Sequence, residues 1–185
     1  DTVLLMENDY PSITLPFHTN SNISIDWLPT DNGKVCTNQI ASKITEKTKA
    51  IAISWVCKTT GQVQDIDTIS ALCKKHDIYC IVDATQALGA IPINLSTTHV
   101  DFFTSSLHKW CFASHGTGVS IVSDKLLHKL TPLSAGVFSQ TDRAMLSTPY
   151  LPTSTAKKFE YGNLNTFGII CGHESFKWFN SLGGA

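Results

Sequence analysis

The sequence predicts an α/β domain with a mostly parallel sheet flanked by helices. Three observations predict it: short apolar runs alternate with helical patterns, several runs are apolar on both faces, and turn residues separate them. The chain has 185 residues, of which 42% are hydrophobic and 16% charged. This size and composition are typical of one globular domain with a buried core.

Six segments have the composition of strands. Apolar runs of four to eight residues, bounded by turn residues, are typical of strands buried in a parallel sheet. In chain order the segments are TVLLME (2–7), ISIDWL (23–28), IAISWV (51–56), YCIVDA (79–84), DFFTSSL (101–107) and GVSIV (118–122).

Two segments predict amphipathic helices. Residues 64–77 carry apolar residues at helical spacing, acidic residues in the first turn and basic residues in the last. Because this helix lies between two predicted strands, we expect a right-handed crossover. Residues 168–182 predict a second helix, which Gly183 ends, whereas residues 131–160, rich in Ser, Thr and Pro, predict a long irregular connection.

Composition and charge exclude several classes of partner. The net charge is −1, so no basic surface is expected to attract nucleic acid or an anionic membrane. No apolar stretch approaches the roughly 20 residues that span a bilayer. The six cysteines form no C-x-x-C pair and no zinc-type spacing, so we expect no metal site and a reducing, cytoplasmic compartment.

The first polar signal is at the end of the strand at 79–84, where Asp83 is followed by Gln86. Ligands of open α/β sheets bind at the carboxyl ends of strands. A buried carboxylate needs a cationic or hydrogen-bonding partner, so one interpretation is that Asp83 pairs with a protonated ring nitrogen. Capping of a short following helix is the alternative.

The second signal is the segment SLHK (106–109), where another predicted strand ends. A single lysine is most often a solvated surface residue. Leu107, Trp110 and Phe112 flank Lys109, however, and desolvation would favour the neutral amine that a Schiff base requires. His108, taken alone, is explained most simply as a hydrogen-bonded core histidine.

Together, the two signals resemble the pyridoxal-phosphate site of the class V aminotransferase family of fold-type I enzymes. This family includes cysteine desulfurases, selenocysteine lyases and isopenicillin-N-epimerase-like enzymes. The segments that carry the resemblance are ENDYPS (7–12), TGQVQDI (60–66), VDATQALG (82–89), SLHKW (106–110) and FEYGNLN (159–165).

The resemblance implies pyridoxal 5'-phosphate as the cofactor, an amino acid as the substrate and a homodimer as the full-length form. Lys109 would hold the cofactor as a Schiff base and move a proton. Asp83 would pair with the pyridine nitrogen and Gln86 with the phenolic oxygen. Ser106 and His108 would reach the phosphate.

Two positions depart from the family pattern. Gly162-Asn163 lies where many relatives have a Gly-Thr that contacts the phosphate across a dimer interface. Lys58 lies where many desulfurases carry an asparagine near the ring. A solvent-facing lysine is its simplest interpretation, and a position near the phosphate or the phenolic oxygen is the alternative; either weakens an assignment to the desulfurase branch. The segment SLHKW favours the epimerase-like and lyase branch, whereas VDATQ suits both branches.

Family members are longer than this chain. By resemblance, residues 1–160 are the central part of the cofactor-binding large domain, without the earlier segment that supplies a phosphate loop and a ring-stacking side chain. Residues 161–185 are a helix that leads towards a C-terminal small domain. The single arginine, Arg143, lies in the Ser/Thr/Pro-rich connection, so we expect no arginine clamp for a substrate carboxylate. Cys111, within KWCFA, predicts core packing rather than a nucleophile.

The hypothesis is therefore a fragment of a pyridoxal-phosphate-dependent transferase or lyase, inactive alone, whose parent acts by transamination, desulfuration, elimination or racemisation. A catalytically incomplete α/β binding module or pseudoenzyme of the same fold is the alternative. A third reading is an unrelated α/β enzyme in which Asp83 and His108 do acid–base work, although no further group supports it.

Overall fold

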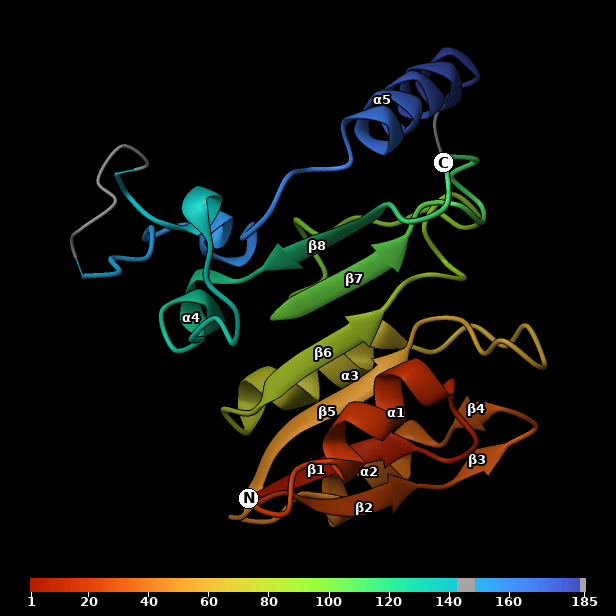
Figure 1. The fold of residues 1–185 in the computed structure, drawn as a ribbon. Helices are drawn as coiled ribbons and strands as arrows, with labels where there is room; N and C mark the ends of the chain where they lie inside the picture. The colour runs from red at the N-terminus through yellow and green to blue at the C-terminus, as the bar shows by residue number, and fades with distance from the viewer. Residues whose placement is uncertain (143–148, 184–185) are drawn as a thin grey trace.

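The computed structural model describes residues 1–142 and 149–183, and one six-stranded sheet organises them (Figure 1). The strand order is β2-β1-β5-β6-β7-β8. All neighbouring strands are parallel except β7 and β8, which are antiparallel. The predicted α/β class is confirmed. The strands are β1 (Thr2–Met6), β2 (Ser24–Leu28), β5 (Thr48–Ser54), β6 (Tyr79–Asp83), β7 (Phe102–Ser106) and β8 (Gly118–Val122).

Helices lie on both faces of the sheet (Figure 1). Helix α1 (Pro11–His18) packs on one face, and α2 (Thr37–Lys43) and α3 (Ile66–Lys75) pack on the other. A two-stranded ribbon precedes α2. Its strands are β3 (Thr30–Asp31) and β4 (Lys34–Val35). Four further elements follow β8 in the chain. They are α4 (Asp124–Leu127), the 3-10 helices η1 (Val137–Ser139) and η2 (Ala156–Phe159), and α5 (Thr166–Ser181).

Alternation along the strands divides the core into two layers. Successive side chains of a strand point to opposite faces, so every second residue faces α1 and the others face α3. The layer on the α1 side is the smaller of the two. It contains Val3, Leu5, Ile13, Ala50 and Ala52, whereas the layer on the α3 side includes Leu4, Met6, Ile51, Ile53, Ile66, Ile69 and Val82.

Both predicted helices are confirmed. The side chain of Asp65 caps α3 by accepting a hydrogen bond from the Thr68 amide at 3.0 Å, and Lys74 and Lys75 lie in the last turn. The Asn165 side chain caps α5 in the same way, accepting from the Gly168 amide at 3.0 Å. The second helix therefore begins two residues before the predicted boundary.

The irregular connection predicted for residues 131–160 contains the two short 3-10 helices. Residues 143–148, which include Arg143, lie outside the described residues. Of the described chain, no helix is both long enough and apolar enough to cross a bilayer.

Candidate functional site

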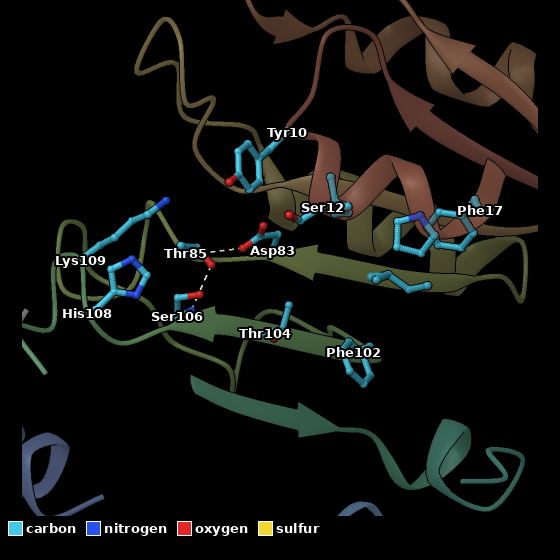
Figure 2. Close-up of a pocket in the computed structure, with 13 residues that line it drawn as sticks. Tyr10, Ser12, Phe17, Asp83, Thr85, Phe102, Thr104, Ser106, His108 and Lys109 are labelled. Carbon is cyan, nitrogen blue, oxygen red and sulfur yellow. Dashed lines mark hydrogen bonds between the residues drawn. The ribbon is translucent and has the colours of Figure 1, made fainter. Parts of the chain in front are cut away.

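A cavity of about 490 Å³ opens between α1 and the carboxyl ends of β6 and β7 (Figure 2). The parallel strands β1, β5, β6 and β7 all end at this edge of the sheet, which is where ligands of open α/β sheets bind. At the polar end of the cavity are Tyr10, Asp83, Thr85, Ser106, His108 and Lys109. Phe17 and Phe102 lie at the opposite, apolar end (Figure 2).

The sheet itself brings the polar side chains together. Asp83, the last residue of β6, lies in register with Ser54 of β5 and Thr104 of β7. Along β7, Thr104 and Ser106 alternate with buried Ser105, so they share a face of the sheet. That face is the one that α1 covers, and the cavity therefore opens over it.

One carboxylate oxygen of Asp83 accepts a hydrogen bond from a neighbouring residue, and the other accepts none from the described residues. Its Oδ1 accepts a hydrogen bond from the Thr85 amide at 2.8 Å. The Thr85 hydroxyl in turn accepts one from the Ser106 amide at 3.1 Å, which joins the ends of β6 and β7 (Figure 2). The second oxygen of Asp83 accepts no hydrogen bond from any described residue, and the carboxylate lies at the cavity wall (Figure 2).

The capping alternative for Asp83 is only partly correct. Residues 84–90 form successive turns rather than the short helix that this alternative assumed. Gly89 in these turns has φ +86°, and a Cβ there would lie 2.7 Å from the carbonyl oxygen of Trp110. The absence of a side chain at Gly89 thus allows the segments that follow Asp83 and Lys109 to approach each other closely.

Lys109 extends into the cavity towards Tyr10 (Figure 2), with its Nζ 5.5 Å from the centroid of the Tyr10 ring. Of the three apolar residues expected to desolvate this lysine, Leu107 is buried, but the expectation is wrong for Trp110 and Phe112, whose exposed fractions are 47% and 64%. Phe112 has φ 52° and stacks on Phe179 of α5 at 5.8 Å between ring centroids. The half-buried Lys109 is covered by Tyr10 instead.

The other predicted residues, Gln86, Ser106 and His108, also reach the site. Ser106 and His108 line the main cavity. His108 is not a core histidine, because it is half-buried and stacks on exposed His115 with ring centroids 4.4 Å apart. Gln86 lines a small adjoining pocket with Lys109, and its Oε1 accepts a hydrogen bond from Trp110 Nε1 at 2.9 Å.

Sequence reasoning gave no role to Tyr10, Asp9, Thr85 or His115. Tyr10 and Asp9 belong to the segment ENDYPS, which connects β1 to α1. The available signal for Tyr10 was its position directly before Pro11. Pro11 is the first residue of α1, and a proline at this position fixes the entry of the chain into a helix. Thr85 lies between Asp83 and Gln86 and could have been found with them.

Asp9 attaches the Tyr10 segment to the end of β5. Its Oδ2 accepts a hydrogen bond from the Ser54 amide at 2.8 Å, and its Oδ1 accepts one from the Tyr10 amide at 2.6 Å. Burial raises the pKa of the Asp9 carboxyl above its ordinary value, hydrogen bonds from Ser54 and Tyr10 act against this rise, and the charge of Asp83 adds to it. Two carboxyl groups therefore interact at this edge of the sheet.

We expect the pKa of Asp9 to lie above its ordinary value of 3.8. Asp77 provides a comparison with the opposite shift. Its pKa should lie below 3.8, because Lys125 Nζ is 2.7 Å from the Asp77 carboxylate. Since native Asp9 keeps its proton to a higher pH than the unfolded chain, its contribution to the free energy of unfolding falls as pH rises from 3.8 through its native pKa. Carboxyl-carbon NMR measures both titrations. Asp83→Asn should lower the pKa of Asp9, and an Asp9 midpoint at or below that of Asp77 would contradict the expectation.

Two negative expectations concern cysteine and metal chemistry. Cys111 is fully buried, burial raises the pKa of its thiol, and its Sγ contacts the Leu88 carbonyl oxygen at 3.4 Å. This is the packing role that the sequence predicts. Within residues 1–142 and 149–183, no group of three or more His, Cys, Asp or Glu side chains could hold a metal ion.

Gly162 and Asn163 are exposed and are not among the residues that line the main cavity.

Comparison with known proteins places the whole chain, residues 1–185, in the family described as aminotransferase class-V. Cysteine desulfurase IscS of Buchnera aphidicola (subsp. Schizaphis graminum) is 39% identical over 114 residues, which are 61% of this chain and 28% of that protein. A probable cysteine desulfurase of Borreliella burgdorferi is 28% identical over 192 residues, covering 98% of this chain and 44% of its own length. The chain thus spans less than half the length of these relatives.

A solved structure shows the same fold. The cysteine desulfurase of Thermococcus onnurineus NA1 superimposes with a TM-score of 0.90 at 22% identity, over 99% of this chain and 46% of that chain. Its identity is too low to carry an argument beyond the fold. The family match, however, extends from the first residue to the last and includes every segment that lines the cavity. The chain belongs to the class V aminotransferase family.

Proposed function

We propose that this chain is the cofactor-binding part of a pyridoxal-phosphate-dependent lyase that acts on an amino acid, with removal of sulfur from cysteine as the favoured reaction. One observation carries the proposal: Lys109 and Asp83, from different strand ends, line one cavity beneath Tyr10. The names of the relatives, which are cysteine desulfurases, support the choice of reaction.

The residues of the cavity fit the cofactor. Asp83 has an oxygen that accepts no hydrogen bond from the described residues, and it suits a protonated pyridine nitrogen. Among the described residues, no carboxylate lies within ion-pair distance of Lys109, whose amine can bind an aldehyde carbon. Ser106 and His108 offer donors to a phosphate at the side of the cavity where β7 ends.

Bound pyridoxal phosphate supplies an electron sink for charge that develops at the substrate Cα. The residues of this chain would do the rest. Lys109 would hold the cofactor and, when released, would move the proton at the substrate Cα. Asp83 would keep the ring nitrogen protonated and Tyr10 would bound the site on the side of α1. The Gln86 side chain, oriented by Trp110, lines the same small pocket as Lys109.

Cofactor capture by the purified chain tests this proposal. Pyridoxal phosphate is added, the product is reduced with borohydride, and the modified peptide is identified by mass spectrometry. We expect modification at Lys109. Modification spread over the exposed lysines, or none, would favour the binding module or pseudoenzyme. We expect the chain to be inactive alone; if the loaded chain does turn over, formation of alanine from L-cysteine with an added thiol as the sulfur acceptor would support desulfuration, whereas formation of D-cysteine would indicate racemisation.

A further inference from the structure

We infer that Lys58 holds the α-carboxylate of the amino-acid substrate. The inference rests on the proposed function and adds a residue that determines which amines the site accepts. Sequence reasoning explained Lys58 most simply as a solvent-facing lysine. Lys58 is indeed exposed, and its ammonium also lies over the Tyr10 ring, 5.0 Å from the ring centroid, on the wall of the pocket that Lys109 also lines.

Two ammonium groups thus share one aromatic ring. Lys58 Nζ and Lys109 Nζ lie 5.0 and 5.5 Å from the centroid of Tyr10. Gln86 and Asp83 line the same pocket. An α-amino acid carries its amino group and its carboxylate on one carbon, so its site needs an amine-reactive centre and a cation within a few ångströms. Lys109 would hold the cofactor aldehyde carbon at which the amino group of the substrate reacts, and Lys58 is placed to supply the cation.

The ammonium of Lys58 is available for a ligand. Ion pairs join Lys43 to Asp26, Lys125 to Asp77 and Lys177 to Glu174, but no carboxylate of the described residues lies within 4.0 Å of Lys58. Lys58 is exposed, so its charge is not costly to maintain before substrate binds. A carboxylate that displaces water there would form a charge-assisted hydrogen bond.

The loop that carries Lys58 is held by its own backbone. The Cys57 amide donates to the Gln62 carbonyl and the Gly61 amide donates to the Cys57 carbonyl, both at 2.9 Å. Gly61 has φ +72°, a conformation that glycine adopts at little cost. The Gln64 amide then donates to the Trp55 carbonyl at 2.8 Å, so the loop leaves and rejoins the end of β5 at fixed points. This rigidity positions the Lys58 side chain on the same side as Gln86.

Two stable adducts of the cofactor test the inference without any turnover. N-(5'-phosphopyridoxyl)-L-alanine and N-(5'-phosphopyridoxyl)-ethylamine share the ring, the phosphate and the secondary amine, and only the first has a carboxylate. Isothermal titration of the cofactor-free chain measures the dissociation constant of each. We expect the alanine adduct to bind roughly 10- to 100-fold more tightly, as is typical for a hydrogen bond to a charged group.

The variants isolate the contribution of Lys58. In Lys58→Met the preference should fall to about one, because the alanine adduct weakens and the ethylamine adduct does not, whereas Lys58→Arg should keep most of it. Lys47→Met removes an exposed lysine just before β5, at the opposite end of that strand, and should leave the preference unchanged. Circular dichroism establishes that each variant is folded.

Three results would overturn the inference. A Lys58→Met chain that keeps the wild-type preference would show that the carboxylate is held elsewhere, and the proposed function would stand. Equal weakening of both adducts would assign Lys58 to the ring, the phosphate or the structure of the loop. Failure of the wild-type chain to bind either adduct would instead overturn the proposed function, and the inference with it.

Discussion

Lys109→Ala is expected to abolish covalent capture of pyridoxal phosphate by this chain. Without the ε-amine, nothing at the end of β7 can bond to the cofactor aldehyde, so after borohydride reduction the peptide that contains residue 109 should carry no label. Lys109→Arg should lose the label equally, because a guanidinium stays protonated and cannot act as the nucleophile. The measurement is the labelled fraction of each lysine-containing peptide, determined by mass spectrometry.

Two other lysines serve as controls for this experiment. Lys47→Ala removes an exposed lysine remote from the cavity and should leave the label on Lys109 unchanged. Lys58→Ala removes the second ammonium over the Tyr10 ring and should also leave Lys109 able to react. If the Lys109→Ala chain became labelled at Lys58 as completely as wild type is at Lys109, the assignment of Lys109 as the attachment point would be wrong.

The strands were predictable because a buried strand of a parallel sheet is a short run of apolar residues, which the sequence shows directly. Each of the six predicted segments overlaps a strand, and all of them except the one at 51–56 match within one residue at either end. The strand predicted at 51–56 instead runs from Thr48 to Ser54, since it begins with polar Thr48 and Lys49, which an apolar pattern cannot include. Pairing order and the antiparallel direction of β8 depend on distant contacts and required the structure.

The helices of the first fifty residues escaped prediction for a different reason. Helix α1 has eight residues, contains Pro16 and has no side-chain cap, and α2 has seven residues with Ile40 as its buried residue. Helices this short show no repeated apolar stripe, and packing against the sheet stabilises them rather than their own propensity. This matters for function because α1 is what covers the cavity and what positions Tyr10.

The candidate site was partly predictable for the same reason as the strands. Asp83 and Lys109 follow two apolar runs, and parallel strands bring their carboxyl ends to one edge. What sequence could not supply was the surroundings of Lys109. Phe112 is apolar and close in sequence, yet its φ of 52° turns the chain away and its ring packs on α5. Tyr10, ninety-nine positions earlier, covers the lysine instead.

Asp83→Asn is expected to separate cofactor attachment from catalysis. The amide keeps the size of the carboxylate, and its oxygen can still accept the hydrogen bond from the Thr85 amide, so the turn after β6 should persist. Lys109 should therefore still capture pyridoxal phosphate. The neutral amide cannot stabilise a positive charge on the pyridine nitrogen, however, so the ring should lose much of its capacity to accept electrons.

The expected loss is large because Asp83 is half-buried at the cavity wall. Removing one partner of such a charge pair costs about 3 kcal/mol, which corresponds to a roughly 100-fold slower proton release from the substrate Cα. Exchange of the Cα hydrogen of L-alanine in D₂O measures that step directly, and the ¹⁵N shift of labelled cofactor reports the ring nitrogen. Asp77→Asn, at an exposed ion pair with Lys125, is the matched control. An Asp83→Asn chain with a still-protonated ring nitrogen and wild-type exchange would assign Asp83 to the turn alone, and the acid that faces the cofactor would have to be sought elsewhere, first at Asp9.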